Sequence, residues 1–194
     1  MEKKVKLKDG TDVMIRQITI EDVDNSFEFF KSLPEEDRAY LRVDVSKREV
    51  VERRIVDMDF GNVRRIVAVY NDKIVADAAL EIGTHGWEKH IGELRLVIAK
   101  DFQRKGLGML LANELYSYAT REEVEEMVVK IMKPQKGAIK IFEKLGFKED
   151  VTLKNYVKDI RGERHDLVIF RCNLKDLWQE LEDYFHEIDH KGMA

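Results

Sequence analysis

Residues 93–123 hold the feature of the sequence that most restricts its fold. The strand-like segment ELRLVIA at 93–99 leads to the turn QRKGLG at 103–108, and a segment with leucines at helical spacing follows. A helix that begins here leaves backbone N–H groups without partners, and the two glycines allow a bound group to approach closely. Because Arg104 and Lys105 add positive charge, this strand-to-helix turn predicts an anion site.

Two common phosphate-binding loops do not fit this turn. A Walker loop requires Gly-x-x-x-x-Gly-Lys-Ser/Thr, which the turn does not supply, and a dinucleotide fingerprint would require a third glycine where the chain has Leu111. The residues alone therefore leave two readings open, a different kind of anion site and an ordinary strand-to-helix turn.

Hydrophobic patterning predicts a single mixed α/β domain. Strand character is found at 3–8, 13–18, 64–70, 74–82, 93–99, 126–132 and 167–174, with a hairpin turn at 71–73. Helical spacing is found at 19–33, in one or two helices over 34–59, and at 108–123, 137–147 and 174–188. We expect the domain to cover 1–173, and the amphipathic helix and tail at 174–194 to pack on it or to form a homodimer contact.

Composition excludes several classes of protein. Hydrophobic residues make up 44% of the 194 residues and charged residues 37%, as in a soluble domain, and no apolar run is long enough to cross a membrane. We therefore expect a cytoplasmic protein without a membrane partner. The net charge of −4 argues against nucleic acid as a partner. Cys172 is the only cysteine, and His85 and His90 fit a polar loop better than a metal site, so no disulfide and no metal are expected.

The turn and its surroundings resemble the GCN5-related N-acetyltransferase (GNAT) family. The family pattern Gln/Arg-x-x-Gly-x-Gly/Ala matches residues 103–108, a second hallmark matches EKLGF at 143–147, and the order of elements from Val13 to Asn173 is similar. This resemblance implies a mostly antiparallel central sheet with helices on both faces. It also implies acetyl-CoA as cosubstrate, with its pyrophosphate held by the turn.

The resemblance also implies roles for individual residues. The backbone of Leu96, Val97 and Ile98 would hydrogen-bond the pantetheine arm and polarise the thioester carbonyl. Residues 104–109 would wrap the pyrophosphate, with Gln103 also in the cofactor site; these are Arg104, Lys105, Gly106, Leu107, Gly108 and Met109. Gln135 stands where many members carry an asparagine near the cofactor. Phe142 stands where many members have a tyrosine that reprotonates the thiolate; either the thiolate leaves unaided, or Tyr116 or Tyr156 serves, or the protein is not catalytic.

Acetyl transfer to an amine also needs a base, for which Glu93 is the first candidate and Glu81 the second. We expect a partly dry cleft to raise the pKa of Glu93 toward neutrality. The segment 16–43 resembles the opening of Pat-type protein lysine acetyltransferases, whose catalytic glutamate begins this same strand, and this implies a protein lysine as acceptor. A small-molecule amine acetyltransferase and a noncatalytic acyl-CoA-binding module are the alternatives.

Overall fold

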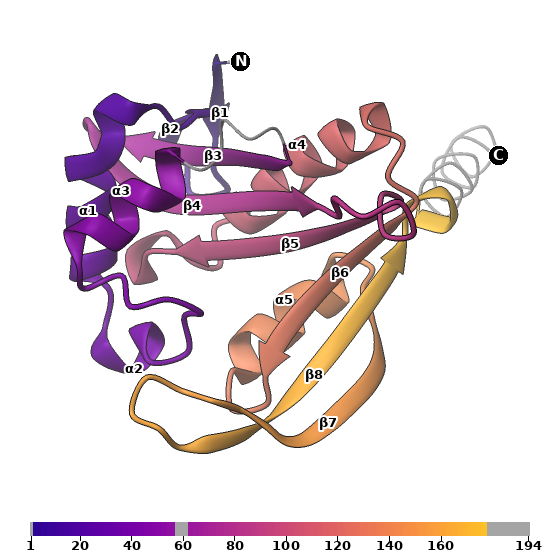
Figure 1. The fold of residues 1–194 in the computed structure, drawn as a ribbon. Helices are drawn as coiled ribbons and strands as arrows, with labels where there is room; N and C mark the ends of the chain where they lie inside the picture. The colour runs from indigo at the N-terminus through magenta and orange to yellow at the C-terminus, as the bar shows by residue number, and fades with distance from the viewer. Residues whose placement is uncertain (1, 57–61, 178–194) are drawn as a thin grey trace, which may run out of the picture.

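A central sheet of eight strands forms the fold of the computed structural model, which describes residues 2–56 and 62–177 (Figure 1). The strands lie in the order β1-β2-β3-β4-β5-β6-β8-β7. Neighbouring strands pair antiparallel except β5 and β6, which pair parallel. The strands are β1 (Glu2–Lys6), β2 (Asp12–Gln17), β3 (Val63–Tyr70), β4 (Lys73–Ile82), β5 (Ile91–Ile98), β6 (Glu126–Met132), β7 (Lys148–Lys158) and β8 (Arg164–Asn173).

Helices cover both faces of the sheet (Figure 1). One face carries α1 (Val23–Ser32) and α3 (Arg48–Val56), whose apolar residues form one buried cluster with Val67 and Ile74 of the sheet. The other face carries α4 (Leu107–Arg121) and α5 (Lys136–Lys144), which bury a larger cluster. The short helix α2 (Glu35–Arg38) follows α1, and 3-10 turns precede α1 and α4 at Ile20–Asp22 and Lys100–Phe102. The predicted mixed, mostly antiparallel α/β fold is confirmed.

Local sequence signals explain where several elements begin and end. The carboxylate of Asp22 accepts a hydrogen bond from the Thr19 backbone N–H at 2.8 Å, which completes a capping box before α1. Asn71 and Asp72 both have positive φ, the conformation of a tight hairpin turn, and they join β3 to β4. Gly146, with a φ of 88°, follows α5 in the left-handed conformation that favours glycine at a helix end.

One strand was not predicted from the sequence, and one predicted helix lies mostly outside the described residues. The prediction missed β7, the edge strand next to β8, because its side chains are mostly exposed and show no regular alternation, and because its pairing with β8 contains two irregularities. The predicted C-terminal helix is helical over residues 174–177, and the rest of it lies outside the described residues. Its packing, and with it the role assigned to 174–194, stays a prediction.

None of the described helices combines the length and apolar character needed to span a membrane.

The strands β5 and β6 diverge in the middle of the sheet (Figure 1). They pair only at Ile91, Gly92 and Glu93, whose partners are Glu126, Met127 and Val128. Beyond Glu93 the strand β5 continues for five residues to Ile98, and β6 continues to Met132. The sheet therefore presents two strand edges to one gap, and Glu93 lies where the gap begins.

Candidate active site

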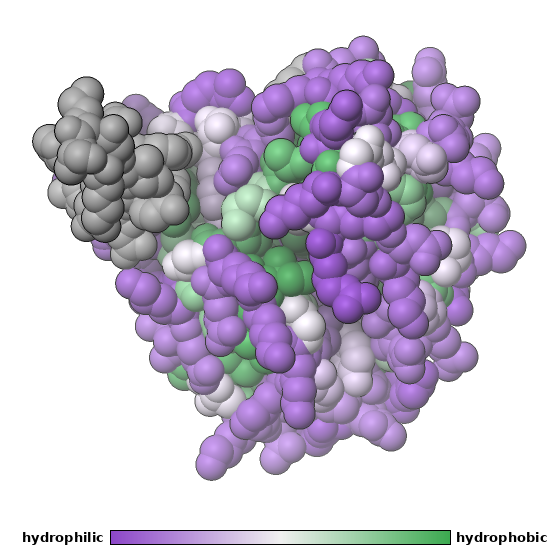
Figure 2. All heavy atoms as spheres, turned by 180° about the vertical axis from the view of Figure 1, so that it is seen from behind, coloured by the Kyte–Doolittle hydropathy of each residue, from purple (hydrophilic) through white to green (hydrophobic). Residues whose placement is uncertain are grey.

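The gap between β5 and β6 has an apolar side formed by three elements. Alternate residues of β5 point to opposite faces, so Leu96 and Ile98 pack with the core under α4, while Val97 packs with the core under α1 and α3. A Cβ on Gly108 of α4 would lie 3.3 Å from Ile98, 3.4 Å from Leu96 and 3.9 Å from Ile141 of α5. Glycine at 108 thus lets α4 approach the strand. On this face apolar side chains gather in a hollow with a polar rim (Figure 2).

The turn that precedes α4 has the backbone of an anion site. Arg104 has a φ of 61° and Gly106 a φ of 89°, and such left-handed residues curl successive N–H groups toward one point. The side-chain amide of Gln103 donates a hydrogen bond to the Ile98 carbonyl at 3.0 Å, which ties the turn to the end of β5. Because N–H groups, a helix start and the two strand edges adjoin one another, these residues fit a phosphate-bearing cosubstrate with an extended arm.

The two basic residues of the turn have different surroundings. Lys105 forms an ion pair with Asp9 at 2.8 Å, and its carbonyl accepts a hydrogen bond from the Lys8 backbone N–H at 3.0 Å. Lys105 therefore anchors the turn to the β1–β2 connection, with its charge offset by Asp9. Arg104 is exposed beside it.

Replacing Gly108 with alanine should weaken binding of acetyl-CoA about tenfold without unfolding the protein. A methyl group here presses on Leu96 and Ile98 and shifts the edge of β5, whereas alanine itself favours a helix by about 1 kcal/mol over glycine. Calorimetric titration of both proteins with acetyl-CoA measures the change. Gly137→Ala in α5 is the matched control, because a Cβ there meets nothing within 4 Å. Equal affinity in the Gly108 variant and the wild type would contradict the prediction.

Glu93 is surrounded by cationic side chains. One carboxylate oxygen contacts Arg42 and lies 3.4 Å from Arg95 Nε, and the other lies 2.9 Å from Lys130 Nζ. Arg95 also pairs with Glu81 of β4. These five residues, Arg42, Glu81, Glu93, Arg95 and Lys130, form what we call the Glu93 charge cluster. It joins β4, β5 and β6 to the segment that follows α2.

This environment reverses the pKa shift expected from the sequence. Burial raises the pKa of the Glu93 carboxyl, but the charge of Arg42, the hydrogen bond from Lys130 and the charge of Arg95 outweigh burial and hold the pKa below its usual value of 4.5. The expectation of a pKa raised toward neutrality is therefore wrong. The sequence shows the glutamate and its strand, whereas Arg42 and Lys130 lie 51 and 37 residues away from it along the chain. Both partners were missed because no local motif links them to it.

The lowered pKa of Glu93 predicts how the cluster affects stability with pH. The ionised carboxylate stabilises the folded protein above about pH 4.5, and this contribution disappears as the pH falls through the lowered pKa. The unfolding free energy of the wild type should therefore exceed that of Glu93→Gln at pH 7, and the difference should shrink only below pH 4.5. Urea unfolding of both proteins from pH 7 to pH 3 measures this difference. A wild-type advantage that grew between pH 7 and pH 5 would indicate a raised pKa instead.

A second group of charges lies buried beneath α3 next to the cluster. Asp77 of β4 accepts a hydrogen bond from Arg65 at 2.6 Å and lies 3.3 Å from Arg54, and the Arg54 guanidinium stacks on the Phe30 ring. Burial, together with the nearby charges of Arg65 and Arg95, lowers the pKa of Arg54 to about 10, although the Asp77 charge opposes this. Arg54 therefore stays protonated at neutral pH. This group carries two cations and one carboxylate.

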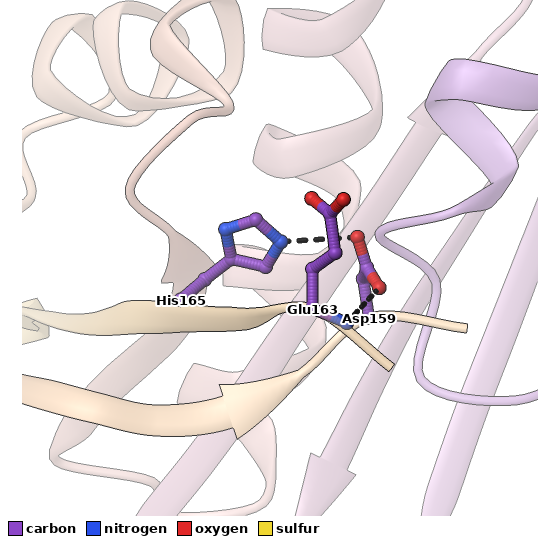
Figure 3. A group of neighbouring side chains, drawn as sticks. All are labelled: Asp159, Glu163 and His165. Atoms are coloured by element: carbon purple, nitrogen blue, oxygen red, sulfur yellow. Dashed lines mark hydrogen bonds and ion pairs between the residues drawn. The ribbon is translucent and has the colours of Figure 1, made fainter. Parts of the chain in front are cut away.

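The turn between β7 and β8 supports the segment that carries Arg42. The Ile160 backbone N–H donates to the Ala39 carbonyl at 3.2 Å, and the ring of Tyr40 packs against His165. Within the turn, Asp159 accepts hydrogen bonds from two backbone N–H groups and lies 3.0 Å from His165 Nε2 (Figure 3). Asp159, Glu163 and His165 lie close enough to share a metal ion, but the contacts of Asp159 already account for its position as the centre of this turn.

The other candidate residues named in the sequence analysis are two aromatic residues in the core, one exposed tyrosine and one glutamine at the end of β6. Phe142 is buried in the core edge to face with Phe147. Tyr116 is also buried, its hydroxyl donates to the Leu145 carbonyl at 3.0 Å, and burial raises the pKa of this phenol far above its usual value. Tyr116 is therefore a core residue and a poor proton donor to a thiolate. Tyr156 lies exposed on β7, and the Gln135 side chain accepts a hydrogen bond from the Met132 N–H at 3.0 Å, at the end of β6.

The sheet thus contains two diverging parallel strands, and a turn with left-handed residues follows at the start of a helix. The model of the acetyltransferase (GNAT) family matches residues 25–147, and the chain belongs to this family. It is an acetyl-CoA-dependent N-acetyltransferase. None of the curated proteins matches the chain in sequence.

Solved structures of low sequence identity share the fold. The GNAT domain of PAT from S. lividans is 18% identical, with 89% of this chain and 96% of that chain covered and a TM-score of 0.74. The ribosomal-protein-S5-alanine acetyltransferase from Vibrio fischeri is 14% identical, with 91% and 98% covered and a TM-score of 0.75. The protein yncA from Salmonella typhimurium, solved with its cofactor acetyl-CoA, is 18% identical, with 84% and 94% covered and a TM-score of 0.72.

Proposed function

We propose that this protein transfers the acetyl group of acetyl-CoA to a primary amine at the mouth of the β5–β6 gap, with Glu93 as the proton acceptor. The observation that carries this proposal is the position of Glu93, at the last residue pair before the strands diverge. The backbone of Leu96, Val97 and Ile98 holds the pantetheine arm as an added strand, and the turn from Gln103 to Met109 holds the pyrophosphate.

Acetyl-CoA supplies an activated acyl group whose thiolate can leave. The protein aligns the amine with this carbonyl, and alignment alone contributes on the order of 7 to 11 kcal/mol in favourable cases. Backbone N–H groups at the edge of β5 polarise the carbonyl oxygen. Because Phe142 has no proton to give, the thiolate leaves without a side-chain acid, which a thiol pKa of about 8.5 makes feasible.

The lowered pKa of Glu93 determines the stage of the reaction at which its carboxylate accepts the proton of the amine. Taking a proton from a free lysine ammonium, with a pKa of about 10.4, would be uphill by roughly 8 kcal/mol for a carboxylate with a pKa of 4.5 or less. The surrounding cations assist here, since positive charge lowers the pKa of a nearby amine. The amine therefore enters neutral, and Glu93 accepts its proton, directly or through a water, once the nitrogen bonds to the acetyl carbon and becomes acidic.

We place a lysine of another protein first among acceptors and a small-molecule amine second. The likeness of segment 16–43 to Pat-type enzymes supports the first. A noncatalytic acyl-CoA-binding module, suggested by Phe142, is the remaining alternative. The enzyme reading accounts for a carboxylate held at the gap, which a binding module would not need.

Two measurements test the proposed function. Calorimetric titration with acetyl-CoA, CoA, ATP and NAD should give binding of acetyl-CoA and CoA alone. Thiol release from acetyl-CoA, followed over a panel of lysine peptides and small amines, should then show an acceptor-dependent rate above slow hydrolysis. Binding of acetyl-CoA with no acceptor-dependent thiol release would favour the binding module instead.

A further inference from the structure

We propose that the acceptor carries an anionic group beside its primary amine, and that Arg42 and Lys130 bind this group. This inference rests on the proposed function, because it names the class of acceptor used at the same site. It assigns a substrate-binding role to two residues whose ion pairs, within the described part of the chain, are with Glu93.

The balance of charge in the Glu93 charge cluster supports the proposal. Arg95 has Glu81 as a partner, whereas Arg42 and Lys130 share the single carboxylate of Glu93. Three cations against two carboxylates leave one positive charge in excess, on a protein whose net charge is −4. Among the residues that the structure describes, the buried group behind β4 adds a second excess charge, because Arg54 and Arg65 both pair with the single carboxylate of Asp77. The acceptor side of the gap is therefore cationic.

Exposure decides which of these groups an incoming molecule meets first. The side chains of Arg42 and Lys130 are 40% and 39% exposed, whereas that of Glu93 is 16% exposed. The guanidinium and the ammonium group thus stand at the surface with the carboxylate enclosed between them. An acceptor with a positive charge beside its amine would meet like charge, and one with an anionic group would meet two hydrogen-bond donors of opposite charge.

Binding of an anion would also change the state of Glu93. Arg42 and Lys130 hold the pKa of this carboxyl down, so an anionic group that competes for them weakens both contacts. The carboxylate then becomes a stronger base at the moment when the amine is in place. An acceptor without the anionic group leaves Glu93 in its paired state, so the same contacts select the acceptor and activate the base.

Two kinds of acceptor carry an anionic group beside a primary amine. The anionic group is the α-carboxylate of a free amino acid, or an aspartate or glutamate next to a lysine in a protein. Each source is tested with a pair of product analogues that differ only in charge. N-acetylglycine is compared with N-acetylglycinamide, and a peptide with acetyl-lysine between two aspartates is compared with the same peptide carrying asparagines.

The experiment titrates these four probes into the protein saturated with CoA and measures their Kd by calorimetry. We expect the anionic member of one pair to bind at least about tenfold more tightly than its neutral partner. Arg42→Gln and Lys130→Gln should each reduce this preference, while Arg171→Gln, which removes an exposed cation paired with Glu126 on the same sheet, should leave it unchanged.

The outcomes separate the anion site from the proposed function. Preference in the amino-acid pair identifies a free amino acid as acceptor, and preference in the peptide pair identifies a lysine with acidic neighbours. If CoA binds but neither pair shows a preference, or if the preference survives in both Arg42→Gln and Lys130→Gln, the anion site is overturned. A protein that fails to bind CoA in the first titration contradicts the proposed function itself.

Discussion

Replacing Glu93 with glutamine should lower kcat by about 10²–10⁴-fold and leave the Kd for acetyl-CoA unchanged. Glutamine keeps the shape of the side chain and its place between Arg42 and Lys130, but it cannot accept the amine proton. The proposed cofactor contacts come from the backbone of β5 and from the turn before α4, which this change does not touch. Thiol release with a confirmed acceptor measures kcat, and calorimetry measures the affinity.

Two further variants test whether the loss of kcat is specific to Glu93. Glu126→Gln removes a carboxylate of β6 that pairs with Arg171, and it should leave kcat within a factor of two or so of the wild type. Glu81→Gln removes the other carboxylate of the Glu93 charge cluster and should have a smaller effect than Glu93→Gln. If Glu81→Gln lost more activity than Glu93→Gln, Glu81 would be the base and our assignment would be wrong.

Replacing Gly106 with aspartate should weaken acetyl-CoA binding at least about 100-fold, or roughly 3 kcal/mol. Gly106 has a φ of 89°, a conformation that costs a residue with a side chain about 1 kcal/mol or more. The new carboxylate would also stand where the pyrophosphate is proposed to bind, so like charges would repel. Calorimetric titration with acetyl-CoA measures the loss.

The matched control for this change is Gly162→Asp in the β7–β8 turn. Gly162 has a φ of 85° and open space around it, so the variant incurs a similar backbone strain away from the β5–β6 gap. We expect both variants to lose a similar amount of stability in urea and only Gly106→Asp to lose affinity. Unchanged affinity in Gly106→Asp would place the pyrophosphate elsewhere.

The fold and the cofactor could be predicted because their signals are local in the sequence. The turn at 103–108 and the leucine spacing of α4 each lie within a short stretch of sequence, and the structure confirms the turn and the helix that they predict. The closeness of Gly108 to Leu96 and Ile98 follows from the same strand-turn-helix unit. Backbone geometry of this kind depends on spacing, which a sequence shows directly.

The electrostatics of the site could not be predicted in the same way. The sign of the Glu93 pKa shift depends on Arg42 and Lys130, which reach the carboxylate only after the sheet forms and the β7–β8 turn supports the segment after α2. Burial alone would raise the pKa of Glu93, which is the shift expected from the sequence. The strand β7 was missed for a related reason, because its place is set by pairing with β8 and not by a pattern of its own.

The divergence of β5 and β6 also leaves two strand edges open to aggregation when no cosubstrate is bound. Two strand edges inside a sheet offer unsatisfied backbone groups to any extended chain, which is the chemistry that drives aggregation at sheet edges. A pantetheine arm seated there would close the sheet and add stability in proportion to the logarithm of its concentration. The concentration of acetyl-CoA would then affect the stability of the folded protein as well as the rate of its reaction.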